Sequence, residues 1–146
     1  MGSGPAPGSM VLLTKLSRVV YRRATDALLG MSLKRYLALT ALREQPDSSQ
    51  QAFCEAVHLD PNNCVLLLNA LEGDALVERR RDPTDRRRHI VSLTPTGQKA
   101  LAHADRALES VEDEVLGCLS ADDRATLHRL LLRAVQGAPR AAEAVG

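Results

Sequence analysis

Between residues 76 and 97, two short runs of strand-forming residues flank a tight and very basic turn. Val77 opens the first run, and residues 90–93 form the second. The connecting residues 82–85, with the sequence Asp-Pro-Thr-Asp, favour a turn because proline presets φ and aspartate side chains hydrogen-bond the nearby backbone. The pattern predicts a β-hairpin with arginines at its tip, which is typical of a nucleic-acid-binding wing.

The positive charge of the chain is concentrated in this hairpin. Residues 79–88 hold six arginines and two aspartates, a local charge of +4 in a chain whose net charge is +1, so the remainder carries about −3. Arginine forks match phosphate oxygens and the edges of DNA grooves. A solvated surface loop is the alternative, disfavoured because strands hold the arginines on a rigid projection. The local field therefore indicates a polyanionic partner.

Composition favours one soluble domain. The chain has 146 residues and 45% hydrophobic content, without a run near the roughly 20 apolar residues of a membrane span. Three cysteines without paired spacing predict a reducing, cytoplasmic compartment and argue against a disulfide framework. An aromatic content of 2% argues against stacking platforms for RNA or single strands.

Helical periodicity predicts four helices before the hairpin. Gly30 ends the first of them, Ser48 or Ser49 caps the third, and Asp60 caps the fourth. The expected ranges are about 10–29, 32–43, 49–57 and 61–73. The third and fourth helices are separated by three residues, which is helix-turn-helix spacing. A helix-turn-helix followed by a hairpin is a winged helix.

Two further helices are predicted after the hairpin. Thr94 or Thr96 caps a long helix from Pro95, and a shorter one follows Ser120. Apolar residues of the long helix step by three and four, at Leu101, Ala104, Leu108, Val111, Val115 and Cys118. With the first helix, these two are predicted to form an intertwined dimer interface. Packing of the same stripes within one chain is the alternative.

The predicted fold class is therefore mainly α: a winged helix-turn-helix with a two-stranded β wing, and N- and C-terminal helices that form a dimerisation domain. One domain spans residues 10–136, with dimerisation helices at about 10–29 and 95–136 around a DNA-binding lobe at about 32–94. Residues 1–9 are interpreted as a disordered leader or a cloning scar. Residues 137–146 are interpreted as a tail.

Two motifs around the hairpin carry a family resemblance. Residues 85–97 (DRRRHIVSLTPTG) fit a D-x-R…(V/L)-x-L-T-x-x-G pattern, and Leu71-Glu72 with residues 76–79 (LVER) fit a Leu-Glu…Gly-Leu-Val-x-Arg junction. Through both, nearly the whole of residues 10–136 resembles the MarR (multiple-antibiotic-resistance regulator) family of winged-helix transcription factors. The resemblance implies a homodimer on a pseudo-palindromic operator, usually as a repressor, with Arg87 in a minor groove and Asp85 orienting it.

The expected DNA contacts fall in three groups. Phosphate contacts come from the start of the third helix, base contacts from the fourth helix, and electrostatic contacts from the wing. Simple helix capping is the alternative for the serines and asparagines. In order, the groups are Ser48, Ser49 and Gln50; Asn62, Asn63, Val65, Leu66 and Asn69; and Arg79, Asp85, Arg86, Arg87 and Arg88.

Three positions depart from the family pattern. Val65 and Leu66 stand where relatives often have Ser or Thr followed by Arg, which leaves direct hydrogen-bond readout there in doubt. Ala75 replaces the glycine that usually precedes the first wing strand, and we expect small geometric consequences only.

Control of DNA binding is open between two modes. Many family members respond to small phenolic or aromatic carboxylates, which implies an effector pocket between the dimer interface and the DNA-binding lobe. Its candidates are Arg18, Tyr21, Arg22, Arg35, Tyr36 and His103, with solvated or core-edge positions as the alternative. A redox switch is the competing mode. Cys64 is its candidate, because a thiol near a helix N-terminus ionises more readily, although an inert buried cysteine is the ordinary outcome.

Other function classes have little support. The four histidines lack paired ligand spacing, and no phosphate-binding loop or nucleophile elbow is present. We therefore expect no metal, no cofactor and no enzymatic activity. The apolar pair Val65-Leu66 motivates a second hypothesis, a redox or ligand sensor that acts mainly through protein contacts and binds DNA weakly.

Overall fold

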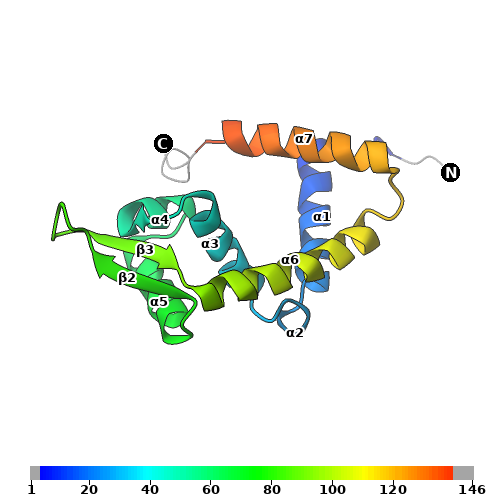
Figure 1. The fold of residues 1–146 in the computed structure, drawn as a ribbon. Coiled ribbons are helices and arrows are strands. Elements are labelled where there is room, and N and C mark those ends of the chain that lie inside the picture. The colour runs from blue at the N-terminus through cyan, green and yellow to red at the C-terminus, as the bar shows by residue number, and fades with distance from the viewer. Residues whose placement is uncertain (1–3, 140–146) are drawn as a thin grey trace.

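The computed structural model describes residues 4–139, so parts of the predicted leader (1–3) and tail (140–146) lie outside the described residues. A wing projects from one end of the molecule, α6 runs away from it, and α7 lies along the top of the view (Figure 1). Among the described residues, no helix is long and apolar enough to cross a membrane. The elements are α1 (Ser9–Arg23), α2 (Asp26–Leu29), α3 (Leu33–Glu44), β1 (Ser48–Ser49), α4 (Gln50–Ala56), α5 (Pro61–Gly73), β2 (Val77–Arg81), β3 (His89–Leu93), α6 (Pro95–Val115) and α7 (Ala121–Gly137).

The predicted wing is the antiparallel hairpin β2–β3, with Val77 opposite Leu93 and Arg81 opposite His89. The sheet also has a third strand that the sequence analysis did not predict. β1 pairs antiparallel with β3 and gives the order β1-β3-β2. It was missed because two serines show no alternation of apolar and polar residues.

The helix-turn-helix has the predicted capping residues. The hydroxyl of Ser49 accepts the Ala52 N–H at the start of α4, and Asp60 accepts the Asn63 N–H at the start of α5. Pro61 stands at the first position of α5, where a missing N–H costs nothing. The two helices pack with α3 and the sheet around a core that includes Leu39, Leu42, Phe53, Leu68, Leu71, Val77 and Val91.

The predicted first helix, residues 10–29, is wrong in one respect: it is two helices. α1 ends at Arg23, and the Thr25 hydroxyl accepts the Leu28 N–H to begin α2. A side chain that caps locally competes with continuation of the helix. Gly30 ends α2 as predicted, with φ of 79° in the left-handed region.

The apolar stripe of α6 packs largely within the chain, which is the alternative that the sequence left open for these residues. Leu101, Ala104 and Val111 are buried in the core, and Leu108 and Val115 pack against it. Periodicity identifies an apolar face but does not say whether the face meets the same chain or another. Other apolar side chains stay exposed on α1 and α7, including Met10, Leu12, Leu13, Leu130 and Val135.

Two of the three cysteines are joined, contrary to the expectation of no disulfide. Cys54 on α4 and Cys64 on α5 form a disulfide with their Cα atoms 5.6 Å apart, and Cys118 is free and exposed. The ten-residue separation matches no familiar pairing motif. Only the packing of α4 against α5 brings the two side chains together.

Candidate nucleic-acid interface

The tip of the wing is ordered by its aspartates. The Asp82 carboxylate accepts the Thr84 N–H and hydroxyl at 2.9 and 2.7 Å, and these hydrogen bonds lower the pKa of Asp82. The Asp85 carboxylate accepts the Arg87 N–H at 3.1 Å. The backbone of Arg87 is thus held while its side chain is exposed, in agreement with an orienting role for Asp85.

The six arginines of the wing divide into two groups. Arg79 donates to Asn69 at 2.6 Å and to Glu72 at 3.1 Å, which ties β2 to α5 and lowers the pKa of Glu72. Arg80 donates to Ser92 at 2.8 Å. Arg81 donates to the Arg86 carbonyl at 3.5 Å. The predicted contact residues Arg79 and Asn69 therefore satisfy each other. The second group is the exposed tip, Arg86, Arg87 and Arg88, in which Arg88 lies 3.7 Å from the Asp85 carboxylate.

The asparagines of the recognition helix differ in their availability. The Asn63 amide donates to the Asp60 carboxylate at 2.6 Å, beside the capping bond from its backbone N–H. These bonds to Asn63 lower the pKa of Asp60. Asn62 is exposed and makes no side-chain hydrogen bond within the described residues. Of the two asparagines for which capping was the alternative, only Asn63 takes part in the cap of α5 through its side chain.

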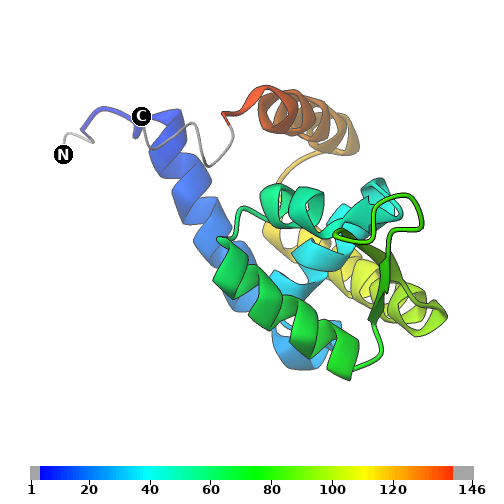
Figure 2. The same cartoon turned by 90° about the vertical axis from the view of Figure 1, so that its left-hand side faces the viewer.

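The exposed side of α5 is apolar at its centre. Leu66 is 66% exposed and Val65 37% exposed, while Cys64, Leu67, Leu68 and Leu71 are buried. Figure 2, viewed from the side of the hairpin tip, shows α4 and α5 on one face of the lobe. A methyl-bearing surface of this kind suits thymine methyl groups better than hydrogen-bonding base edges.

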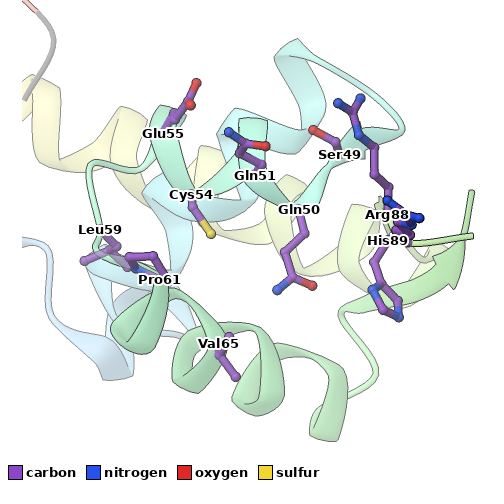
Figure 3. A pocket seen from close by; sticks show the side chains of 11 residues that line it. Ser49, Gln50, Gln51, Cys54, Glu55, Leu59, Pro61, Val65, Arg88 and His89 are labelled. Carbon is purple, nitrogen blue, oxygen red and sulfur yellow. The ribbon is translucent and has the colours of Figure 1, made fainter. Parts of the chain in front are cut away.

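A cavity of about 480 Å³ lies between α4, α5 and the tip end of the wing (Figure 3). Its lining includes Ser49, the N-cap of α4, and Gln50 at the start of α4. Val65 lines it from α5, and Arg87 and Arg88 line it from the wing. Of the predicted phosphate contacts, Ser48 donates to the Gln45 carbonyl at 2.5 Å, and Ser49 caps α4. Gln50 keeps its amide open to this cavity. The structure thus brings together predicted residues from all three groups.

The six candidates for an effector pocket are not brought together. Arg18, Tyr21 and Arg22 line one open depression on α1 with Lys15 and Val19. Arg35 pairs instead with Asp74 at the end of α5, at 2.5 Å. His103 lies against Gly30, and Tyr36 faces α6. A separate cavity of about 370 Å³ lies between α3, β3 and α6, and it holds Arg43, Asp47 and Asp105, which sequence reasoning did not select.

A charged cluster beside that second cavity joins the lobe to α6. The Tyr36 hydroxyl donates to Asp105 at 2.5 Å, and Arg43 donates to the same carboxylate at 2.6 Å. The bond from Arg43, supported by that from Tyr36, lowers the pKa of Asp105. Burial and the neighbouring carboxylate raise the pKa of Tyr36. No local sequence motif could reveal the cluster, because its members are 62 and 69 residues apart.

Replacing Asp105 with asparagine is expected to lower the free energy of unfolding at pH 7 by about 1 kcal/mol, a small value because the side chain is about a third exposed. A lowered pKa means that the carboxylate contributes stability above its ordinary pKa of 3.8, and that this is lost as pH falls through the folded-state value. Urea unfolding should show the difference at pH 7 and its loss in strong acid. Glu109→Gln, on the exposed side of α6, is the control; equal effects of the two changes would contradict the assignment.

Ala75 adopts the backbone geometry of the glycine that it replaces. Its φ is 59°, in the left-handed region, and its carbonyl accepts the Thr94 hydroxyl at 2.5 Å. The junction between α5 and β2 therefore keeps its turn at the cost of strain, which a β-carbon in this region brings.

The comparisons with known proteins agree with this geometry. The MarR family profile matches residues 31–89. A transcriptional regulatory protein from Thauera aromatica is 35% identical over 104 residues, which cover 71% of this chain and 63% of that relative, less than two thirds of its length. The transcriptional regulator HosA of Escherichia coli O111:H- is 34% identical over 97 residues, which cover 66% of this chain and 72% of HosA. Both relatives are named as transcriptional regulators, in agreement with the expectation that the chain is not an enzyme.

Two solved structures share the fold. The transcriptional repressor CouR, bound to a 23-mer DNA duplex, matches with a TM-score of 0.75 and 27% identity, covering 91% of this chain and 99% of CouR. PcaV from Streptomyces coelicolor, in complex with its natural ligand, matches with a TM-score of 0.70 and 24% identity, covering 95% of this chain and all of PcaV. Fold, wing motif and sequence relatives lead to one conclusion: the chain belongs to the MarR family of winged-helix transcriptional regulators.

Proposed function

We propose that this protein is a sequence-specific DNA-binding regulator that acts as a homodimer on a pseudo-palindromic operator. One observation carries the proposal: the open side of α5, the start of α4 and the tip arginines meet around one cavity. In a winged helix, such a face puts a helix into a major groove while the wing reaches the adjacent backbone and minor groove. CouR, which has this fold, is bound to duplex DNA.

The homodimer is supported by apolar surface that the single chain does not cover. Met10, Leu12 and Leu13 of α1 and Leu130 and Val135 of α7 are between 42% and 72% exposed. α7 has no buried residue, although it is 17 residues long. Exposed patches of this kind are typical of interfaces between subunits. Repression, the commoner mode in the family, and a cytoplasmic location complete the proposal.

A small-molecule effector is the finer part of the proposal. Arg18, Arg22 and Tyr21 share one depression on α1, where a guanidinium beside an aromatic ring suits an aromatic carboxylate. PcaV, of the same fold, is in complex with its natural ligand. The alternative, a sensor that acts mainly through protein contacts, rests on the exposed Leu66 and Val65 at the centre of the recognition helix.

The direct test is selection of a randomised duplex pool on the purified protein. Enrichment of a palindrome supports the DNA-binding dimer and supplies an operator for titration. No enrichment, together with retention of a protein partner through Leu66 and Val65, would establish the alternative.

Arg87→Ala should weaken operator binding by about 1–3 kcal/mol per subunit, the range of one good groove contact. Its backbone N–H is already held by Asp85, so the change removes only the exposed side chain and leaves the turn intact. Fluorescence anisotropy at fixed salt measures the loss. Arg106→Ala, an exposed arginine of α6 outside this face, should bind as wild type. Unchanged affinity of Arg87→Ala would make Arg87 a solvated loop residue.

A further inference from the structure

Two cysteines meet directly beneath the DNA-binding face. Cys54 and Cys64 join α4 to α5, the two helices of the helix-turn-helix. The two sulfurs differ in access: Cys64 is 0% exposed, whereas Cys54 is partly exposed and lines the 480 Å³ cavity with Gln50, Val65 and Arg87. Figure 3 shows the Cys54 sulfur directed from α4 toward α5 at the edge of that cavity.

We propose that Cys54 and Cys64 form a reversible thiol–disulfide site that is coupled to DNA binding: the disulfide favours the DNA-binding form, and bound DNA protects the disulfide. This inference rests on the proposed function. It assigns control to a pair of cysteines, in which Cys54 is the sulfur that reagents reach and the previously favoured Cys64 is its buried partner.

Oxidation requires a small hydroperoxide. The Cys54 sulfur attacks one peroxide oxygen, the O–O bond breaks, and the alcohol leaves, so that Cys54 becomes a sulfenic acid. The Cys64 sulfur then attacks the Cys54 sulfur and water leaves. Two thiols and one hydroperoxide thus give one disulfide, one alcohol and one water. A small dithiol reverses the state by attacking Cys54, releasing Cys64 as a thiol, and leaving as its own cyclic disulfide.

Coupling to DNA follows from the packing around the pair. A bonded pair of sulfurs is about 2 Å apart, whereas two thiols need an ordinary contact distance of about 3.5–4 Å. Cys64 is fully buried among close-packed side chains, whereas Cys54 borders the cavity. After reduction, either the Cys54 side chain turns into the cavity or α5 shifts relative to α4. Both movements disturb the face that presents Val65 and Arg87, so the reduced form should bind DNA less tightly.

The same cavity is the route to Cys54. A duplex lying across α4, α5 and the wing covers it, so reagents should reach Cys54 more slowly in the complex. Linkage also requires that the factor by which the disulfide tightens DNA binding equal the factor by which DNA stabilises the disulfide. One coupling can therefore be measured in two independent ways.

The experiment uses the full chain with Cys118→Ser, which removes the exposed third thiol. The protein is equilibrated in graded mixtures of reduced and oxidised dithiothreitol, with and without a duplex selected from a random pool. Thiols are then trapped with N-ethylmaleimide and counted by intact mass. We expect an intrachain disulfide, and we expect the oxidised protein to bind the duplex about 2- to 10-fold more tightly than the reduced protein. The midpoint of the thiol–disulfide equilibrium should shift by the same factor when the duplex is present. A tenfold difference in DNA affinity corresponds to a change of about 30 mV in the reduction potential of the disulfide.

Single-cysteine variants test the order of events. Dimedone should label Cys54 after hydrogen peroxide treatment of Cys64→Ser, and should leave Cys64 unlabelled in Cys54→Ser. Should either variant fail to fold, the mass measurement on the Cys118→Ser protein still shows whether the disulfide forms and whether DNA stabilises it. Absence of an intrachain disulfide would overturn the inference alone. So would equal DNA affinity of the reduced and oxidised protein together with the same redox midpoint with and without DNA. Absence of binding to any duplex in both states would overturn the proposed function and the coupling with it.

Discussion

Raising the salt concentration from 50 to 200 mM should weaken operator binding about a thousandfold. The tip arginines Arg86, Arg87 and Arg88 are exposed, and two subunits bring six of them to one operator. Each phosphate that is neutralised releases condensed counterions and steepens the logarithmic salt dependence by about 0.9, so six contacts give a slope near −5. Arg79, Arg80 and Arg81 are excluded from this number because each donates a hydrogen bond to a group of the protein itself. Arg88 is included because its ion pair with Asp85 is exposed and long, at 3.7 Å.

Anisotropy titration of the selected duplex across the salt series measures the slope. Replacing Arg87 by alanine in both subunits should flatten it by about two, since two positive charges that displace counterions are removed from the interface. The Arg106→Ala protein should keep the wild-type slope. If the operator affinity of the wild type did not depend on salt, the charged tip would not face DNA. That result would contradict the proposed function.

Local chemistry explains what the sequence could predict. The limits of α5 are set by Asp60, which caps it, and by Pro61, which fits its first position, and both effects act within a few residues. The hairpin is equally local, because a turn of Asp, Pro and Thr lies between its strands. The predicted fold class is confirmed by the CouR structure and by the family relatives.

The remaining features depend on contacts between distant segments. The α6 stripe has the same periodicity whether it packs within its own chain or against a second one, and only the packed fold shows Leu101 and Val111 buried. The Cys54–Cys64 bond and the Tyr36–Asp105 contact have no local signature at all. Within the interface, pattern alone could not distinguish Asn63, which binds Asp60, from the open Asn62.

Among the described glycines, Gly97 is the one at which an alanine should destabilise the protein most. Gly97 is buried near the start of α6, and a β-carbon there would lie 2.1 Å from the carbonyl oxygen of Leu76. That oxygen belongs to the backbone and already accepts the Thr94 N–H, so it has no rotamer by which to move away.

The clash must be relieved by displacing α6 from the junction between α5 and the wing. Overpacking of this kind costs about 3 kcal/mol or more, which corresponds to a fall in Tm of about 6–12 °C at equal protein concentration. Gly73→Ala is the matched control, because a β-carbon at Gly73 meets nothing within 4 Å and an alanine near a helix end has the better propensity. Thermal unfolding should separate the two variants widely. A Gly97→Ala protein as stable as Gly73→Ala would mean that α6 does not pack against Leu76, and the lobe and the long helix would then have to be placed differently.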